Sequence, residues 1–279
     1  MSIIFSIFPK FYRELSLDQL AELVRETGLD TTNLAVRDGY WCEPATLERD
    51  VARFVSGMAK HGLKIHFATT GYALAALVKD PTPLKILADN GIREFRMGYF
   101  EQSPDDARGA YDRARKEMEQ MAELCGKYRI RAVYQIHHWT LVPNASAAYF
   151  IINGLPAESI GIELDPGNQT FEGTEDVAKS ISLLGDHLVA FGIKDTRPRF
   201  DPAKKLEPGK GWERDWCSLD EGQVNWHDVV RPLAKRKWSG TFVFMPFYHE
   251  HDSQLRTSVL KKEVVYLRNV ISQLVLKPS

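Results

Sequence analysis

The sequence of 279 residues predicts a single-domain α/β protein, a (β/α)8 barrel that spans residues 1–279. Short apolar segments alternate with longer amphipathic segments eight times along the chain, which is the pattern of a parallel barrel. No linker or low-complexity segment interrupts this alternation. An open doubly wound sheet has the same alternation, but no glycine-rich phosphate loop follows the first apolar segment, which weakens a nucleotide-binding version of that fold.

The first half of the chain contains four of the expected strand–helix pairs. The first helix has clear limits, because Ser16 is a favoured N-cap residue and Gly28 a favoured C-terminal stop. Gly62 and Gly91 likewise end a helix directly before the next strand. The expected elements are, in order, strand 2–8, helix 16–28, strand 31–37, helix 45–62, strand 63–70, helix 83–91, strand 92–100 and helix 105–127.

The second half contains the other four pairs and one long irregular stretch, residues 196–224. A connection of this length usually covers a site or moves. The expected elements are, in order, strand 131–138, helix 146–154, strand 159–165, helix 174–185, strand 188–195, the irregular stretch, helix 226–238, strand 240–248 and helix 253–274.

Composition excludes several classes of function. With 36 basic and 37 acidic residues the chain has a formal charge of −1, so nothing favours nucleic acid as a partner. The apolar N-terminal run is too short for a signal peptide or a membrane span, and we expect no membrane partner. Cys42, Cys125 and Cys217 form no CxxC pair, which argues against a disulfide framework or a zinc site and suits a reducing, cytoplasmic location.

The strand 159–165 raises a question about its two acids. Alternate side chains of a strand point to opposite faces, so Glu163 and Asp165 share one face. In a (β/α)8 barrel the site lies at the C-terminal ends of the strands, where Asp165 is the last residue before Pro-Gly. Asp165 could equally shape that turn. We expect Glu163, one layer deeper, to pair with an inward base such as Arg96 or Lys194, since an unpaired buried charge is costly.

Other polar residues fall at predicted strand ends. Each of them also has a purely structural interpretation. An arginine at a strand end, for example, is often a salt-bridge partner. Of the adjacent His137 and His138, alternation places one inward and the other toward the helices. His249 and His251 resemble part of a metal-ligand cluster, although such residues are also typical of a solvated loop. The full set of candidates is Arg37, Arg96, Gln135, His137, Asp165, Asn168 and Lys194, with His249 and His251 as weak metal candidates.

In this order, the segments resemble the xylose-isomerase-like TIM barrels that are grouped as sugar phosphate isomerases and epimerases. The similarity covers nearly the whole chain. Each motif alone is loose, but their order along the chain makes the resemblance more specific. The motifs are residues 36–65, 91–100, 132–138 (AVYQIHH), 162–173 (IELDPGNQTFEG), 191–195 (FGIKD) and 218–226 (SLDEGQVNW).

The resemblance implies a chemistry and a metal site. Active members hold a divalent metal with two Glu, one Asp and one His, and move a proton between adjacent carbons through an enediol. In this sequence only the Asp position is kept, as Asp165. The first Glu position falls on Gln135, the His position of strand seven on Gly192, and the second Glu at about Met245. A further His, which accompanies the Asp in the family motif, falls on Asn168. An amide, a glycine and a thioether are poor ligands for a hard cation.

Two hypotheses follow. The first is a sugar or sugar-acid isomerase or epimerase with a rebuilt site: Asp165, His137 and Lys194 are catalytic, and Arg37, Arg96, Gln135 and Asn168 bind an anionic or polyol substrate. Its partners are a small carbohydrate or sugar acid and, in a homo-oligomer, its own copies. The one implied cofactor is Mn²⁺ or Mg²⁺, bound weakly if at all, through Asp165 with His137, His249 and His251. The second hypothesis is a non-catalytic relative that binds a small ligand.

Overall fold

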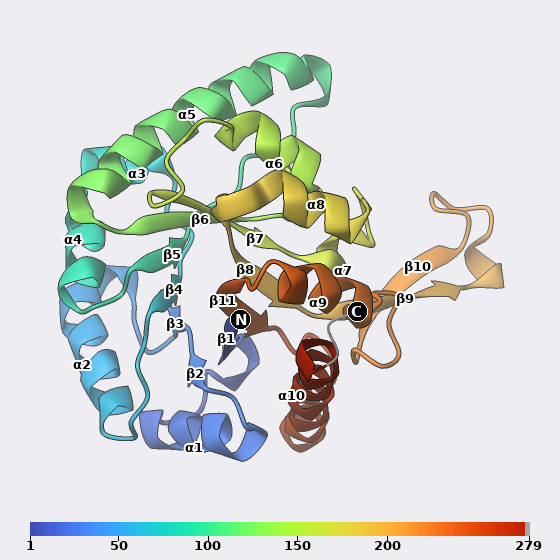
Figure 1. The fold of residues 1–279 in the computed structure, drawn as a ribbon, viewed down its shortest axis with the longest axis horizontal. Coiled ribbons are helices and arrows are strands. Elements are labelled where there is room, and N and C mark those ends of the chain that lie inside the picture. The colour runs from blue at the N-terminus through green and yellow to red at the C-terminus, as the bar shows by residue number, and fades with distance from the viewer. Residues whose placement is uncertain (277–279) are drawn as a thin grey trace.

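The strands close into a parallel barrel surrounded by helices (Figure 1). The computed structural model describes residues 1–276. The sheet has the order β2-β1-β11-β8-β7-β6-β5-β4-β3. The strands are β1 (Ser2–Ile7), β2 (Thr31–Thr32), β3 (Leu34–Ala35), β4 (Phe67–Thr69), β5 (Glu94–Arg96), β6 (Arg131–Gln135), β7 (Ile160–Leu164), β8 (Leu188–Ile193) and β11 (Ser239–Phe244).

The two ends of this order are halves of one strand. Only Asn33 separates β2 from β3, and β2 pairs with β1 while β3 pairs with β4. The Asn33 amide also donates to the carbonyl of Ile7 at 2.8 Å, which continues the ladder across the interruption. The ring of hydrogen bonds is therefore closed through this strand, and the predicted eight-stranded barrel is confirmed.

Helices cover the outside of the barrel. Helix α1 begins with a full capping box between Ser16 and Gln19 and ends at Gly28, whose φ of +75° is the left-handed conformation that glycine tolerates best. The helices are α1 (Leu17–Thr27), α2 (Leu47–Ala59), α3 (Leu74–Lys79), α4 (Thr82–Asp89), α5 (Ala107–Tyr128), α6 (Ala145–Ile152), α7 (Pro166–Gln169), α8 (Val177–Leu184), α9 (Trp226–Lys235) and α10 (Ser253–Leu276).

The strands bury apolar side chains on both faces, as expected for a parallel barrel. The larger core lies between strands and helices. A smaller core fills the barrel interior, and its buried members are Phe8, Ala35, Phe67, Val133, Val189, Ala190, Val243 and Met245. A few buried polar side chains, such as Ser6 and Asn33, which are hydrogen-bonded to each other, also lie inside the barrel.

The stretch 196–224 is not irregular, and this expectation is wrong. Most of it forms an antiparallel hairpin of β9 (Asp195–Phe200) and β10 (Trp212–Cys217), which projects from the barrel (Figure 1). The charged residues Arg197, Arg199, Glu213 and Asp215 lie on one face of the hairpin. Phe200, Trp212 and Trp216 lie on the other face, where Arg214 interrupts the apolar row. Ion pairs from Arg199 to Glu213 and Asp215, and contact between the rings of Phe200 and Trp212, hold the strands together.

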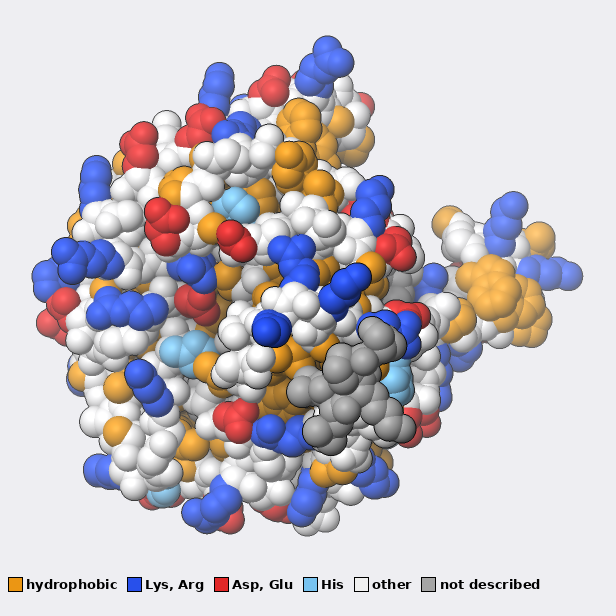
Figure 2. Space-filling model, viewed as in Figure 1, with side chains coloured by type: hydrophobic (Ala, Val, Ile, Leu, Met, Phe, Trp, Pro, Cys, Tyr) orange, Lys and Arg blue, Asp and Glu red, His pale blue; other side chains and the backbone are white. Residues whose placement is uncertain are grey.

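Two short helices, α3 and α7, were also not expected, and several strands are shorter than their apolar segments. Figure 2 shows hydrophobic and basic side chains on the projecting hairpin. None of the helices within residues 1–276 combines the length and the apolar character that crossing a membrane requires.

Candidate functional site

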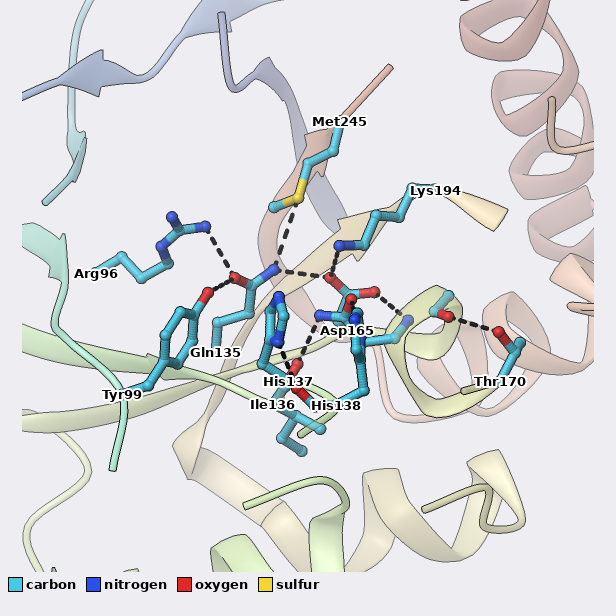
Figure 3. Close-up of polar contacts among 12 residues, drawn as sticks. Arg96, Tyr99, Gln135, Ile136, His137, His138, Asp165, Thr170, Lys194 and Met245 are labelled. Carbon is cyan, nitrogen blue, oxygen red and sulfur yellow. Dashed lines mark hydrogen bonds and ion pairs between the residues drawn. The ribbon is translucent and has the colours of Figure 1, made fainter. Parts of the chain in front are cut away.

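Four adjacent strands bring four polar side chains together at their C-terminal ends (Figure 3). Arg96 and Gln135 are the last residues of β5 and β6, and Asp165 and Lys194 directly follow β7 and β8. All four are buried, with exposed fractions of 5% or less. Because parallel strands end at one edge, residues far apart in sequence become neighbours here.

The four side chains form one continuous chain of contacts. Arg96 Nη1 donates to Gln135 Oε1 at 2.8 Å, and the Tyr99 hydroxyl donates to the same oxygen at 2.6 Å. Gln135 Nε2 donates to Asp165 Oδ2 at 2.7 Å, and Lys194 Nζ lies 3.2 Å from that oxygen. These contacts orient the Gln135 amide, whose oxygen faces the arginine and whose nitrogen faces the carboxylate.

Asp165 also shapes the turn that follows β7. Its Oδ1 accepts from the backbone amide of Asn168 at 2.9 Å, as the N-cap of α7. The Asn168 side chain in turn donates to the carbonyl of Ile136 at 3.0 Å and faces His138 Nδ1 at 3.1 Å. The turn-shaping and site interpretations of Asp165 are therefore compatible, because each uses a different carboxylate oxygen.

Burial dominates the electrostatics of the Asp165–Lys194 pair. It raises the pKa of Asp165 and lowers the pKa of Lys194, while their mutual attraction opposes both shifts. The Lys194 ammonium also lies 4.6 Å from the ring centroid of Trp216 and 4.9 Å from that of Phe247. Two aromatic faces and one carboxylate thus replace water around this cation.

Glu163 lies one layer deeper and forms no ion pair. Neither of its carboxylate oxygens has a hydrogen-bond partner in the part of the chain that the structure describes. The expected pairing with Arg96 or Lys194 is wrong, because Arg96 points its guanidinium at Gln135 and Lys194 contacts Asp165. Complete burial raises the pKa of Glu163 to about 7, so the carboxyl is close to half protonated at neutral pH.

His137 and His138 do not point to opposite faces, so that expectation is also wrong. Strand β6 ends at Gln135, and beyond it the chain leaves the alternating geometry. The two imidazoles stack with centroids 4.3 Å apart, and the His138 ring also stacks on Phe171. Burial lowers the pKa of both histidines to about 4, so both are neutral at pH 7.

Arg37 lies at the same end of the barrel, half-buried. Its guanidinium carbon is 5.1 Å from the ring centroid of Phe8, and that of Arg96 is 5.2 Å from the same centroid. Lys10 was not among the residues expected from the sequence. Its Nζ lies 4.9 Å from the ring centroid of Phe247, and Lys194 Nζ lies over the same ring. The sequence did contain a signal for it, since Phe-Pro-Lys directly follows the first strand.

A model of the xylose isomerase-like TIM barrel family matches residues 9–269. The chain belongs to this family. No curated protein sequence matches it.

Solved structures of the same fold share little sequence with it. A xylose isomerase-like TIM barrel protein from Mycobacterium smegmatis, in complex with magnesium, is 17% identical with a TM-score of 0.68 and covers 98% of this chain and 97% of its own. D-psicose 3-epimerase from Clostridium cellulolyticum H10 is 12% identical with a TM-score of 0.72, covering 96% and 99%. A probable 3-DHS dehydratase from Bacillus anthracis is 16% identical with a TM-score of 0.67, covering 95% and 99%.

The positions where the family resemblance implies metal ligands do converge. Gln135 Nε2 lies 2.7 Å from Asp165 and 3.6 Å from the Met245 sulfur. A Cβ added at Gly192 would lie 2.4 Å from Asp165 Oδ2, so the carboxylate occupies the space into which a side chain at 192 would extend. These positions therefore lie close together at the strand ends.

The donor set does not fit a divalent cation. Asp165 Oδ2 already accepts from Gln135 and contacts Lys194, and Oδ1 accepts from the Asn168 amide. A cation at Asp165 would have to displace an ammonium group. Within residues 1–276, no three His, Cys, Asp or Glu side chains are grouped as metal ligands. His249 and His251 are exposed in the turn after β11, and no contact joins either of them to Asp165 in this part of the chain.

Proposed function

We propose that this chain is a sugar or sugar-acid isomerase or epimerase that moves a proton at a carbon next to a carbonyl without a divalent metal. The observation that carries the proposal is the buried Lys194 ammonium beside Asp165, at the strand ends where the family's metal-ligand positions converge. The comparisons support the fold and the kind of chemistry, since related structures include sugar epimerases.

Lys194 is the group that polarises the substrate carbonyl in this proposal. An ammonium has three N–H donors, and Asp165 accepts one of them. The others are available to the carbonyl oxygen, whose negative charge grows as the enediolate forms. A fixed cation in a site with little water stabilises such charge strongly. Asp165 holds the ammonium in place, and Gln135 and Asn168 hold Asp165.

His137 is the proposed base. Its Nδ1 lies 2.8 Å from the carbonyl of His138, and because a carbonyl only accepts, Nδ1 carries the proton. Nε2 therefore presents a free lone pair, and the ring is only partly buried. Both oxygens of Asp165 already accept hydrogen bonds, which makes that carboxylate a weaker candidate for removing a proton.

A second candidate function is ligand binding without catalysis. The loss of three of the four family metal ligands favours it, because that loss removes the usual mechanism. The two functions differ in one measurable step, the exchange of a carbon-bound proton with solvent.

The test incubates the purified protein with ketoses, aldoses and sugar acids in D₂O with a chelator, and follows the proton next to the carbonyl by NMR. Exchange at one carbon that survives chelation and is lost in His137→Gln supports the proposal. His61→Gln, at a surface histidine bonded to Asp18, is the matched control and should exchange normally. Exchange that requires added Mn²⁺ or Mg²⁺ overturns the metal-free mechanism. A thermal shift without any exchange favours the binding function.

A further inference from the structure

The C-terminal end of the barrel contains more positive than negative charge. Its basic side chains lie on two aromatic rings, Arg37 and Arg96 on Phe8, Lys10 and Lys194 on Phe247. We call these four residues (Lys10, Arg37, Arg96 and Lys194) the cationic mouth. Only Lys194 has a carboxylate in ion-pair contact within the described chain.

Arg96 is the most demanding member of the cationic mouth, because it is 95% buried without an acid. Its Nη1 donates to the neutral Gln135 amide, and its Nε has no hydrogen-bond partner among residues 1–276. A buried cation without a counter-charge costs free energy unless something else neutralises it. Glu163 is close enough for its charge to interact with that of Arg96, but neither of its carboxylate oxygens has a hydrogen-bond partner among residues 1–276.

Arg37 raises the free-energy cost of burying the Arg96 charge, because it places a second positive charge near the first. The side chain has no hydrogen bond or ion pair in the described part of the chain. Because both guanidinium carbons lie close to the Phe8 centroid, at 5.1 and 5.2 Å, they are no more than about 10 Å apart. Burial and the charge of Arg96 both lower the pKa of Arg37, which is the signature of like charges held near each other.

Lys10 extends the positive region toward Lys194. Burial and the charges of Arg37 and Arg96 lower the pKa of Lys10, while Glu250, in the exposed turn after β11, opposes them. Its ammonium lies over Phe11 and Phe247, so its carbon stem and its charge both face aromatic surface. The four basic groups thus lie on two aromatic rings at one end of the barrel.

We propose that Arg37 and Arg96, with Lys10, form a subsite for an oxyanion group of the substrate, a carboxylate or a phosphate. The substrate class is then an acidic sugar, held at its anionic end by the two arginines on Phe8 and at its carbonyl end by Lys194. Guanidinium groups bind such oxyanions with paired, charge-assisted hydrogen bonds. Gln135 links the two ends, because it contacts both Arg96 and Asp165.

This inference deepens the proposed function and rests on it only for the carbonyl end, because anion binding needs no turnover. The test measures binding by calorimetry, in chelated buffer, for glucose, glucuronate and glucose 6-phosphate. We expect at least one acidic sugar to bind about tenfold or more tightly than glucose. Preference for glucuronate identifies a carboxylate subsite, and preference for glucose 6-phosphate a phosphate subsite.

The variants concentrate on Arg37, which is half-buried and has no partner whose loss would disturb the fold. Arg37→Met should abolish the preference for acidic sugars, and Arg37→Lys should keep part of it. Arg25→Met, at an exposed arginine of α1 paired with Glu22, is the control and should leave it unchanged. Equal binding of acidic and neutral sugars by the unaltered protein, or an unchanged preference in Arg37→Met, overturns the inference.

The two proposals fail separately. Acid-selective binding without solvent exchange leaves the oxyanion subsite standing and removes the catalytic function. Solvent exchange with neutral sugars, without any preference for acidic sugars, supports the catalytic function and removes the oxyanion subsite.

Discussion

The two ends of the barrel use similar residues in different ways. At the N-terminal end, Arg131 of β6 pairs with Glu94 of β5 at 3.0 Å, and His66 lies 2.9 Å from the Thr241 hydroxyl. At the C-terminal end, Arg96 of the same β5 meets only a neutral amide. One strand thus carries a charge with a partner at one end and a charge without a carboxylate partner at the other, within the described chain.

This difference separates structural charges from functional ones. In the Glu94–Arg131 pair each charge compensates part of the desolvation of the other, although burial still raises the pKa of Glu94. In the cationic mouth only Lys194 has an ion-pair partner among the described residues, so the other three basic groups are available to an anionic ligand. Four substitutions test this difference between the two ends of the barrel, and the expected effect on stability decreases from the first to the last.

The largest effect is expected from Lys194→Met. It leaves Asp165 as a fully buried carboxylate without its cation, and breaking a buried pair from one side costs about 3–5 kcal/mol. Urea unfolding at pH 7 measures the loss, and solvent exchange should disappear. The double variant with Asp165→Asn should recover part of the stability. A single variant as stable as the original protein would contradict the assigned role of the pair.

Glu163→Gln tests the unpaired acid below the mouth. The folded pKa of about 7 exceeds the ordinary value of 4.5, so between these values the folded state holds a proton that the unfolded chain releases. The resulting stability is complete below about pH 4.5 and is lost as pH rises through 7. The difference corresponds to roughly 3 kcal/mol.

The measurement compares unfolding free energies of the two proteins from pH 5 to 8. The variant should lose less stability over this range. Glu263 and Asp195, whose pKa values burial raises to about 8 and about 6, titrate in both proteins and cancel in the comparison. Parallel pH profiles would show that Glu163 is ionised throughout, against the expectation.

Glu94→Gln breaks the pair at the N-terminal end. Arg131 keeps a side-chain exposure of 28%, so water compensates part of the loss and we expect a cost of about 1–2 kcal/mol in chemical unfolding. Binding of acidic sugars should stay within about twofold of the original value. A large loss of binding would mean that the two ends are coupled.

Arg37→Met should have the smallest effect on stability, within about 0.5 kcal/mol of zero or slightly stabilising, because it removes one of two neighbouring like charges. The same variant should have the largest effect on binding of acidic sugars. Thermal unfolding with and without glucuronate measures both. Destabilisation comparable to that of Glu94→Gln would place Arg37 among the structural charges.

Most of the architecture was predictable because it follows from local patterns. Apolar segments, caps such as Ser16 and the glycines before strands specify where elements begin and end. The hairpin of β9 and β10 was missed because its apolar face is short and interrupted by Arg214, while charge pairs such as Arg199–Asp215 hold the other face.

The site was predictable in its membership and less so in its contacts. Strand ends converge in any parallel barrel, so Arg96, Gln135, Asp165 and Lys194 could be grouped from sequence. Trp216 could not, because it lies beside Lys194 only once β10 pairs with β9, which places Trp216 at the base of the hairpin. The directions of His137 and His138 depend on where β6 stops, which alternation does not reveal.

The sequence by itself determined the barrel, the family and the residues at the strand ends, because periodicity and caps act over neighbouring positions. Only the tertiary structure decided which charges have partners. Coulomb interaction depends on distances of a few ångströms between residues on different strands and on the water that burial removes. Glu163 and Asp165 show this most clearly. The two acids lie on one face of one strand, but among the described residues Asp165 pairs with Lys194 and Glu163 has no hydrogen-bond partner.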